Sequence, residues 1–289
     1  MSNQKEVGKI TELPRKLLQE VAKIIVSYST GLIKVTTNSS GAESSALIGS
    51  GTFVSISDTY GILTAAHVID LLKGHFSLGL ILSNYEHKYT IKSEYLSVIR
   101  IAKGHVDSHG PDLGFIVLPS SEIGTIRAKK GFCNLDIKRD KMLANPPRLD
   151  EGFWVLYGVP DIKTIDKPTA KSFELIKEYN TFCFFGGIRN LFIVDEFDYC
   201  NFEVKYDSIS NIPETFGGFS GGGLWQVPLL KSSENIIEPQ EYILSGVVFY
   251  QTERAGLNRS IKCHCRNSIY DKAYSFIAEN RKQKTENKQ

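Results

Sequence analysis

Three residues of this chain carry side chains that can act as a nucleophile, a base and a carboxylate that orients the base. His67 ends the segment Gly-Ile-Leu-Thr-Ala-Ala-His, Asp112 precedes the apolar run Leu113–Leu118, and Ser220 lies within Gly-Phe-Ser-Gly-Gly. A serine hydroxyl is a weak nucleophile at neutral pH and needs an adjacent base. Histidine can accept its proton, and a carboxylate can fix the tautomer of the imidazole and stabilise the imidazolium that forms. Together the three residues predict acyl transfer through a serine nucleophile.

The glycines around Ser220 predict a second part of the same chemistry. Negative charge builds on the substrate oxygen during acyl transfer, so hydrogen-bond donors must already point at it. Gly218 lets the backbone turn, and the main-chain N–H groups of Gly218 and Ser220 would then converge on that oxygen. Gly221 and Gly222 leave room for the substrate backbone to approach.

Each of the three residues also has an ordinary explanation. Ser220 could belong to a simple glycine-rich turn, His67 to a strand end in the core, and Asp112 to a turn after Gly-Pro. A second acid, Asp107, lies five residues before Asp112, but no buried strand follows it directly. A carboxylate at the mouth of a buried strand needs a partner, which a histidine supplies. The combination therefore favours the triad His67, Asp112 and Ser220.

The order His, Asp, Ser and these local sequences resemble the chymotrypsin/trypsin-like serine endopeptidases. Ile-Gly-Ser-Gly-Thr-Phe-Val at 48–54 is similar to the strand that leads to the histidine in bacterial members of that family. Leu-Ser-Gly-Val-Val-Phe-Tyr at 244–250 is similar to the strand that forms one wall of the primary specificity pocket. The resemblance extends from about Thr30 to about Tyr270. It implies peptide-bond hydrolysis through an acyl-enzyme intermediate. In the α/β-hydrolases the serine comes first in the sequence, so the order His, Asp, Ser argues against that arrangement.

The resemblance also implies positions for the substrate pocket. Glu214, six residues before Ser220, would lie at the base of the pocket, where an acid selects lysine or arginine. Its ordinary explanation is a solvent-facing residue in a loop of different length. The pocket wall is expected to include Val248, Phe249, Tyr250 and Gln251. Gln251 stands where this wall usually has a glycine, so its side chain could narrow the entrance.

One departure from the digestive members concerns activation. In those enzymes the residue before the serine is an aspartate that accepts a newly formed N-terminal ammonium. Phe219 occupies that position here. The full-length chain is therefore expected to need no N-terminal cut. The alternatives are a constitutively competent protein, control by a regulatory protein partner, or control by ordering of the pocket.

The elements that must position these residues are expected to form an all-β fold of two six-stranded antiparallel β-barrels of the chymotrypsin type, with an N-terminal and a C-terminal helix. The expected divisions are 1–29 (helical extension), 30–120 (first barrel with His67 and Asp112), 121–267 (second barrel with Ser220) and 268–289 (helix and tail). Helical spacing of apolar residues predicts a helix over Pro14–Tyr28. Strands are predicted at Gly31–Thr37, Ala46–Ser57, Gly61–Thr64, Phe76–Leu82, Tyr89–Ile91, Tyr95–Ile101, Leu113–Leu118, Gly152–Tyr157, Phe182–Phe185, Leu191–Val194, Phe202–Tyr206, Gly222–Trp225, Tyr242–Tyr250 and Lys262–Cys265. A helix is predicted over Ser268–Glu279, a frayed tail from Arg281, and a surface insertion over 161–180.

Composition sets limits on partners and location. The 289 residues are 42% hydrophobic and 23% charged, with a net charge of +2, which favours a globular protein without strong attraction to nucleic acid or membrane. No apolar run approaches the roughly 20 residues of a membrane span, and the N-terminus lacks a signal pattern. An odd number of cysteines, five, then indicates reduced thiols and a cytoplasmic location.

One short string suggests a metal site. Cys263-His264-Cys265 has no second ligand pair at zinc-like spacing, so two small residues on the core face of a late strand is the favoured explanation. No metal and no cofactor is expected, and the expected partner is a protein or peptide substrate. The rival hypotheses are a catalytically silent peptide-binding module of the same fold and an esterase that uses the same triad.

Overall fold

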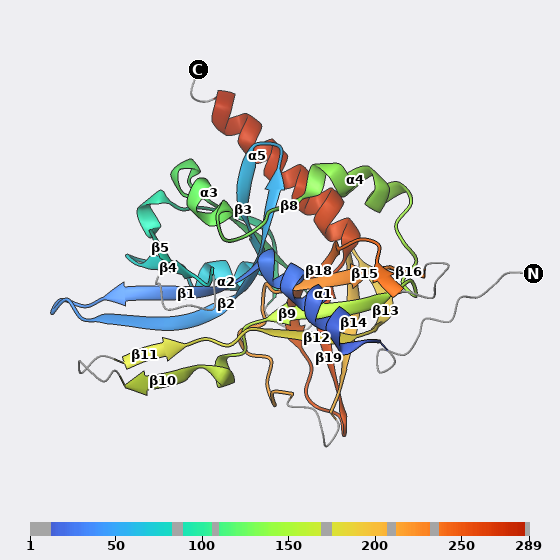
Figure 1. Ribbon diagram of the computed structural model, residues 1–289. Coiled ribbons are helices and arrows are strands. Elements are labelled where there is room, and N and C mark those ends of the chain that lie inside the picture. Colours follow the sequence, from blue (N-terminus) through green and yellow to red (C-terminus); the bar gives the residue numbers. More distant parts are fainter. Residues whose placement is uncertain are drawn as a thin grey trace, which may run out of the picture.

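The fold is known from a computed structural model that describes residues 13–82, 89–105, 110–168, 175–206, 212–231 and 237–286. Strands make up most of the regular structure, with helices near both ends of the chain and in the segment that connects β7 to β9 (Figure 1). The elements in chain order are α1 (Arg15–Ser27), β1 (Ser29–Thr37), β2 (Glu43–Ile56), β3 (Thr59–Thr64), α2 (Ala66–Asp70), β4 (Ser77–Leu80), β5 (Tyr89–Lys92), η2 (Ser93–Tyr95), β6 (Ser97–His105), β7 (Gly110–Val117), α3 (Ser120–Arg127), β8 (Cys133–Asn134), α4 (Leu135–Ala144), β9 (Phe153–Gly158), η3 (Asp161–Lys163), β10 (Ile165–Pro168), β11 (Leu175–Glu178), β12 (Phe182–Gly186), β13 (Ile188–Val194), β14 (Phe197–Lys205), β15 (Gly223–Val227), β16 (Leu229–Lys231), β17 (Ile237–Pro239), β18 (Ile243–Gln251), β19 (Asn258–His264), η4 (Ser268–Ala273) and α5 (Tyr274–Glu286).

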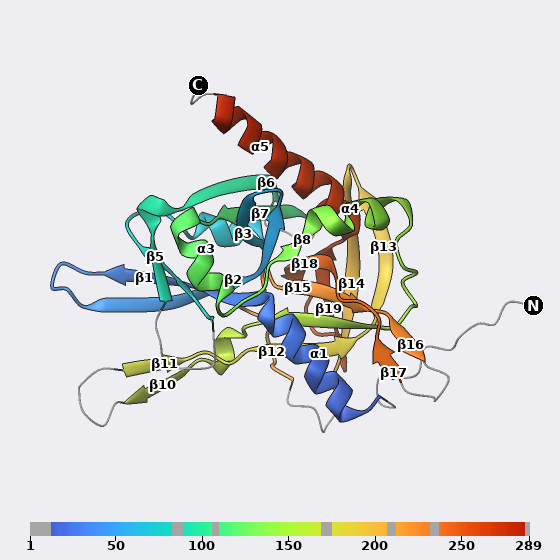
Figure 2. The same ribbon diagram turned by 45° about the horizontal axis from the view of Figure 1, so that its top comes forward.

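The first sheet contains eight strands in the order β5-β4-β1-β2-β3-β7-β6, with β8 paired to β2. The pairs along this order are antiparallel, and β8 alone runs parallel to its neighbour. β2 is long: its first residues are exposed or half-buried, and everything from Gly49 onward is buried. The outer parts of β1 and β2 extend from the body as an arm, with the β10–β11 hairpin beside it in both views (Figures 1 and 2). Lys177 Nζ of β11 donates to the carbonyl of Ser45 on β2 at 2.8 Å, which joins the two hairpins.

The second sheet contains seven strands in the order β12-β9-β15-β18-β19-β14-β13, all antiparallel. Its central strands β9, β15 and β18 are almost entirely buried, as expected for apolar runs covered on both faces. Trp154, Trp225 and Tyr157 are the largest fully buried side chains and come from β9 and β15. The second sheet therefore has a continuous hydrophobic interior beneath the segment that carries Ser220.

Helix α1 packs into the core rather than lying apart from it. Apolar residues at positions 17, 21 and 25 recur with helical spacing, and Leu17, Val21 and Ile25 are buried in one cluster with Val155 and Trp225. Figures 1 and 2 both show α1 against the strands of the second sheet. The predicted helix over Pro14–Tyr28 agrees with α1 to within one residue at each end.

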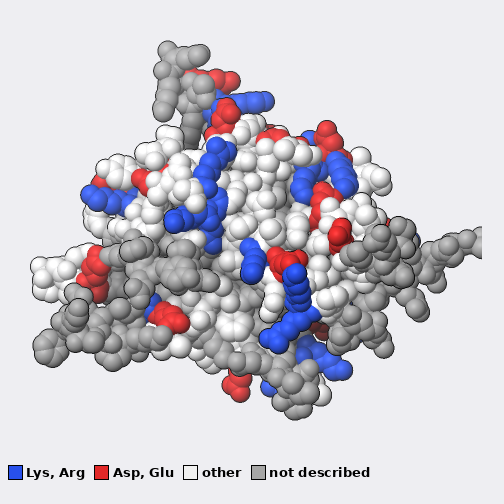
Figure 3. All heavy atoms as spheres, in the orientation of Figure 1, with Lys and Arg blue, Asp and Glu red and all other residues white. Residues whose placement is uncertain are grey.

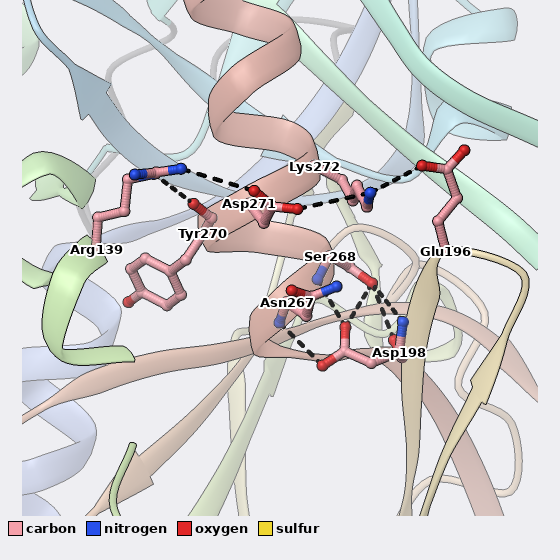
Figure 4. Close-up of polar contacts among 8 residues, drawn as sticks. All are labelled: Arg139, Glu196, Asp198, Asn267, Ser268, Tyr270, Asp271 and Lys272. Carbon is pink, nitrogen blue, oxygen red and sulfur yellow. Dashed lines mark hydrogen bonds and ion pairs between the residues drawn. The ribbon is translucent and has the colours of Figure 1, made fainter. Parts of the chain in front are cut away.

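The C-terminal helix begins at a polar junction with β14 (Figure 4). The carboxylate of Asp198 accepts the main-chain N–H groups of Asn267 and Ser268 at 2.9 and 2.6 Å. These N–H groups are orphaned at a helix start, so Asp198 acts as a cap supplied by a distant strand. Lys272 on the next turn pairs with Glu196 at 2.8 Å. The start of the C-terminal helix is thereby fixed to β14 and to the turn between β13 and β14.

The prediction of two six-stranded barrels agrees with the structure only in part. The fold is strand-rich and includes a half-barrel sheet, but its two large sheets have eight and seven strands. Among the described residues, no ladder joins β5 to β6 or β12 to β13, so neither sheet closes by hydrogen bonding. Within these two sheets, β8 is the one strand with no counterpart among the predicted strands.

Three smaller predictions need correction. The segment between the sheets contains helices α3 and α4, which were not predicted. Part of the expected surface insertion is the β10–β11 hairpin. The predicted tail from Arg281 is helical to Glu286, because α5 continues beyond Glu279.

The surface carries charges of both signs. On the face drawn in Figure 3, Lys and Arg side chains are interspersed with Asp and Glu. Within the described residues, no helix is long and apolar enough to cross a membrane.

Candidate active site

His67 is placed by a tight connection between β3 and α2. Ala65 and Ala66, just before it, are fully buried, so the small side chains allow this corner to pack against β7. Gly114 of β7 completes the fit: a side chain there would collide with Ile69 of α2. The imidazole of His67 keeps 29% of its side-chain surface exposed, which leaves it accessible from the cleft.

Asp112, at the start of β7, binds His67 with both carboxylate oxygens. Oδ1 accepts the main-chain N–H of His67 at 2.8 Å, and Oδ2 forms a short hydrogen bond with Nδ1 of the ring. The side chain of Asp112 is only 12% exposed. A carboxylate in this position holds the proton on Nδ1, so Nε2 is the ring nitrogen that can accept another proton.

A second histidine contacts Asp112 from the other sheet. Nε2 of His264, at the end of β19, accepts the main-chain N–H of Asp112 at 2.9 Å. His264 is fully buried, and desolvation lowers its pKa to about 4. In the sequence, His264 stands out only as part of the string Cys263-His264-Cys265. Its position is determined by strand pairing, because the β18–β19 ladder places His264 opposite Val247.

Ser220 lies on a loop anchored by a buried aromatic ring. Phe219, just before it, is fully buried and contacts Phe216 and Phe184, with ring centroids 4.9 and 5.7 Å apart. The ring also covers Gly158 of β9, where any side chain would collide with it. An apolar anchor therefore occupies the position directly before Ser220, where the resemblance to the digestive serine endopeptidases would place an aspartate.

The same loop is tied to the first sheet through Ser50 of β2. Ser50 Oγ donates to the carbonyl of Gly218 at 2.7 Å, and Ser50 N–H donates to the carbonyl of Ser220 at 2.8 Å. Gly49 must be a glycine, because a Cβ there would lie 2.8 Å from the Ser220 carbonyl oxygen. These contacts hold the loop against β2 of the first sheet, whose neighbour β3 leads to His67. The one hint of these contacts in the sequence is the string Gly-Ser-Gly at 49–51.

The backbone around Ser220 leaves two N–H groups available. Gly218 has φ +87°, a conformation that favours glycine, and a side chain there would strike the Val159 carbonyl oxygen. Phe219, Gly221 and Gly222 donate to main-chain carbonyls. Within the described part of the chain, the N–H groups of Gly218 and Ser220 have no main-chain acceptor. These are the two donors predicted to form an oxyanion hole.

The residues of the predicted triad border one cleft of about 340 Å³, although they come from α2, β7 and the loop before β15. No hydrogen bond joins the Ser220 hydroxyl to His67 among the described contacts. Catalytic hydrogen bonds are often long or poorly aligned before substrate binds. The cleft lining consists of His67, Asp112, Phe216, Gly217, Ser220, Val248, Phe249, Tyr250, Gln251 and Ile261.

The predicted pocket residues fall into two groups. Val248, Phe249, Tyr250 and Gln251 line the cleft, but Glu214 does not. Glu214 is exposed, and its main-chain carbonyl accepts a hydrogen bond from Arg259. Glu214 lies six residues before Ser220 but does not reach the cleft, because the chain is exposed at Glu214 and turns into the core only at Phe216.

Gln251 is held in place by its neighbours. Its Oε1 accepts the N–H of Phe216 at 2.8 Å and a hydrogen bond from Arg259 at 3.3 Å. Ile261 faces Gln251 across the β18–β19 ladder and also lines the cleft. Sequence reasoning missed Ile261 and Arg259, because their proximity depends on the register of two strands.

The cysteine string splits between two environments. Cys263 and Cys265 are buried in one apolar cluster with Cys200, whereas His264 points to the opposite side. Hydrogen bonding to neighbouring thiols, together with burial, raises the pKa values of Cys200 and Cys265 well above that of a free thiol. In the described part of the chain, no group of His, Cys, Asp and Glu is arranged to hold a metal ion. The second candidate acid, Asp107, lies outside the described residues.

Comparisons with known proteins give little beyond this geometry. No family model matches the chain, and no curated protein matches it. Among solved structures, the chain is similar to the crystal structure of Rv3671c protease in an inactive form, with 13% sequence identity and a TM-score of 0.45. The match covers 91% of this chain and 96% of that one.

Proposed function

We propose that this protein is a serine endopeptidase. Ser220 attacks the scissile carbonyl, Nε2 of His67 takes the hydroxyl proton and later delivers it to the leaving amine, and Asp112 orients His67. Water then hydrolyses the acyl-enzyme by the same route in reverse. The observation that carries the proposal is the double contact between Asp112 and His67 at the edge of a cleft that Ser220 also borders.

The oxyanion hole belongs to the same proposal. The N–H groups of Gly218 and Ser220 bind the developing negative charge on the substrate oxygen. The chymotrypsin-like arrangement of two barrels, with 30–120 and 121–267 as their extents, is proposed on the same basis. The cleft then lies where the two sheets meet.

The cleft lining supports an apolar substrate side chain next to the scissile bond. Phe216, Val248 and Ile261 supply apolar walls, and Asp112 is the one carboxylate among the described lining residues. That carboxylate is already engaged by His67. A lysine or arginine side chain would lose its hydration without gaining a partner, and the adjacent charge of Arg259 would repel it. We therefore propose cleavage after apolar residues in place of the basic specificity that Glu214 suggested.

Mass-spectrometric mapping of cleavage sites in a denatured proteome tests both points. We expect cuts mainly after apolar residues, and no cuts by the Ser220→Ala variant. The Glu214→Gln variant should keep the wild-type pattern, because its side chain lies outside the cleft.

Two results would contradict the proposal separately. Undiminished cleavage by Ser220→Ala, with its fold confirmed by circular dichroism, would disprove the mechanism. Cuts mainly after lysine or arginine that disappear in Glu214→Gln would restore the basic specificity and leave the mechanism intact.

A catalytically silent peptide-binding module remains the alternative class. It would bind peptides in the cleft without turnover, and it predicts the same affinity for wild type and Ser220→Ala with no cleaved product from either.

A further inference from the structure

His264 has a place in the fold that the proposed mechanism does not use. It ends β19 in the second sheet, whereas Asp112 begins β7 in the first sheet. Its Nε2 accepts the Asp112 N–H at 2.9 Å, so one hydrogen bond joins the two sheets directly behind the His67–Asp112 pair. The contact spans 152 residues of sequence.

The hydrogen bond defines the tautomer of His264. An imidazole nitrogen that accepts an N–H must carry a lone pair, so the ring proton lies on Nδ1. Nδ1 is buried, and it has no hydrogen-bond partner among the described residues. Leaving a buried donor unpaired costs free energy, so a site that served packing alone would favour an apolar side chain of similar size.

The surroundings of the ring favour this neutral acceptor. Phe249, Tyr199 and Phe197 surround it, with ring centroids 4.9, 5.0 and 5.8 Å away. An apolar aromatic shell disfavours the charged imidazolium, and burial lowers the pKa of His264 accordingly. The ring therefore stays a hydrogen-bond acceptor at neutral pH. Alternation along β19 also fixes its direction, because Cys263 and Cys265 on either side are buried in the opposite cluster.

We propose that His264 is a positioning residue: by accepting the Asp112 N–H, it fixes the start of β7 so that both Asp112 oxygens stay on His67. This inference rests on the proposed peptidase function for its consequence in turnover. His264 touches neither the substrate nor the reacting atoms. It acts through Asp112, whose carboxylate in turn sets the orientation and tautomer of His67.

The test compares two substitutions of His264. His264→Leu keeps apolar bulk but removes the acceptor, whereas His264→Gln can present an amide oxygen at a similar reach. We expect kcat for a peptide substrate to fall about 10- to 100-fold in the leucine variant, because losing a buried hydrogen bond that positions the site should slow the reaction by about one to two powers of ten. KM should stay within about twofold, because substrate contacts are unchanged, and the glutamine variant should recover most of kcat.

Phe197→Leu is the matched control, because it alters packing against the same ring without touching the acceptor. We expect its kcat to equal that of wild type. A folded leucine variant with wild-type kcat would overturn the proposal. So would an equal loss in Phe197→Leu, which would mean that packing alone explains the effect.

A spectroscopic readout separates this proposal from the peptidase function. The proton shared by His67 Nδ1 and Asp112 gives a strongly deshielded NMR signal that needs no turnover. We expect it to broaden or shift upfield in His264→Leu and to be retained in His264→Gln and Ser220→Ala. An unchanged signal in the leucine variant would overturn the positioning role, even if the protein cleaves no peptide.

A measurement on the unaltered protein covers the case in which the leucine variant does not fold. The ¹⁵N chemical shifts of the His264 ring report its tautomer. We expect a protonated Nδ1 and a bare Nε2. The opposite tautomer could not accept the Asp112 N–H and would overturn the proposal.

Discussion

Asp112 is the residue on which the candidate site depends most closely. Its two carboxylate oxygens bind His67, and its main-chain N–H binds His264. One residue thus connects an accessible histidine at the cleft with a fully buried one behind it. The two imidazoles differ in environment, so the same side chain type can serve as a proton carrier in one place and as a fixed acceptor in the other.

The burial of His264 predicts a loss of stability in acid. Its pKa is about 4 in the folded protein, against 6.5 for an ordinary histidine, so the unfolded chain binds this proton more readily between those values. The free energy of unfolding should therefore fall as pH drops from 6.5 towards 4, by up to about 3 kcal/mol from this group. Urea unfolding at pH 7 and pH 4.5 measures the change.

The His264→Gln variant isolates the contribution of this histidine from that of the carboxylates. Its stability should decline less between the two pH values than that of wild type. Equal declines in both proteins would contradict the attribution to His264.

The residues of the candidate site that could be predicted best from the sequence are those with a recognisable local sequence. His67, Asp112 and Ser220 each carry a short recognisable context, and all three border one cleft. Glu214 was misplaced because counting along a loop assumes a loop length. His264 was missed because its partner is distant in sequence, and only the pairing of β18 with β19 and the meeting of two sheets bring it to Asp112.

The loop around Ser220 is the element that determines whether the site is preformed. Phe219 anchors it in the core of the second sheet, Ser50 binds Gly218 from the first sheet, and Gly221 N–H binds the Val248 carbonyl at 2.7 Å. These contacts need no charged group inserted from a new N-terminus. That the uncut chain is competent stays a prediction.

Phe219→Ala should loosen this element. Removing a fully buried phenylalanine costs about 3–5 kcal/mol of unfolding free energy, and the oxyanion donors on either side of it should lose their fixed positions. We expect kcat to fall together with stability, whereas Phe219→Leu should retain most of both. Urea unfolding and turnover of the same preparations provide the measurement. Wild-type stability and kcat in the alanine variant would show that the ring does not anchor the loop.

Among the helices and strands, the spacing of apolar residues predicted those that bury a definite face. The apolar spacing of α1 and the continuous apolar runs of β9 and β18 were visible, because these elements bury a definite face. Helix α4 was not predicted, since its sequence is largely charged and only Leu135 and Met142 are buried. Strand closure could not be predicted either, because it depends on pairing between distant edges.

In the whole molecule, the N-terminal helix is part of the core. The buried side of α1 packs against the second sheet, and Lys130 Nζ donates to the Val26 carbonyl at its C-terminal end at 2.9 Å. Tyr28 follows and contacts Trp225, with ring centroids 5.6 Å apart. A cut near Gly31 would remove this helix and expose the apolar surface beneath it. We therefore expect loss of this helix to destabilise the fold.

Labelling of the full-length protein with a fluorophosphonate probe, read by intact mass and peptide mapping, tests the central claim most directly. The probe reacts with a serine only where a base and an oxyanion hole activate it. We predict one adduct on the uncut chain, located at Ser220, absent in Ser220→Ala and strongly slowed in Asp112→Asn. Absence of any adduct, an adduct on another residue, or labelling confined to a form that begins near Gly31 would contradict the account.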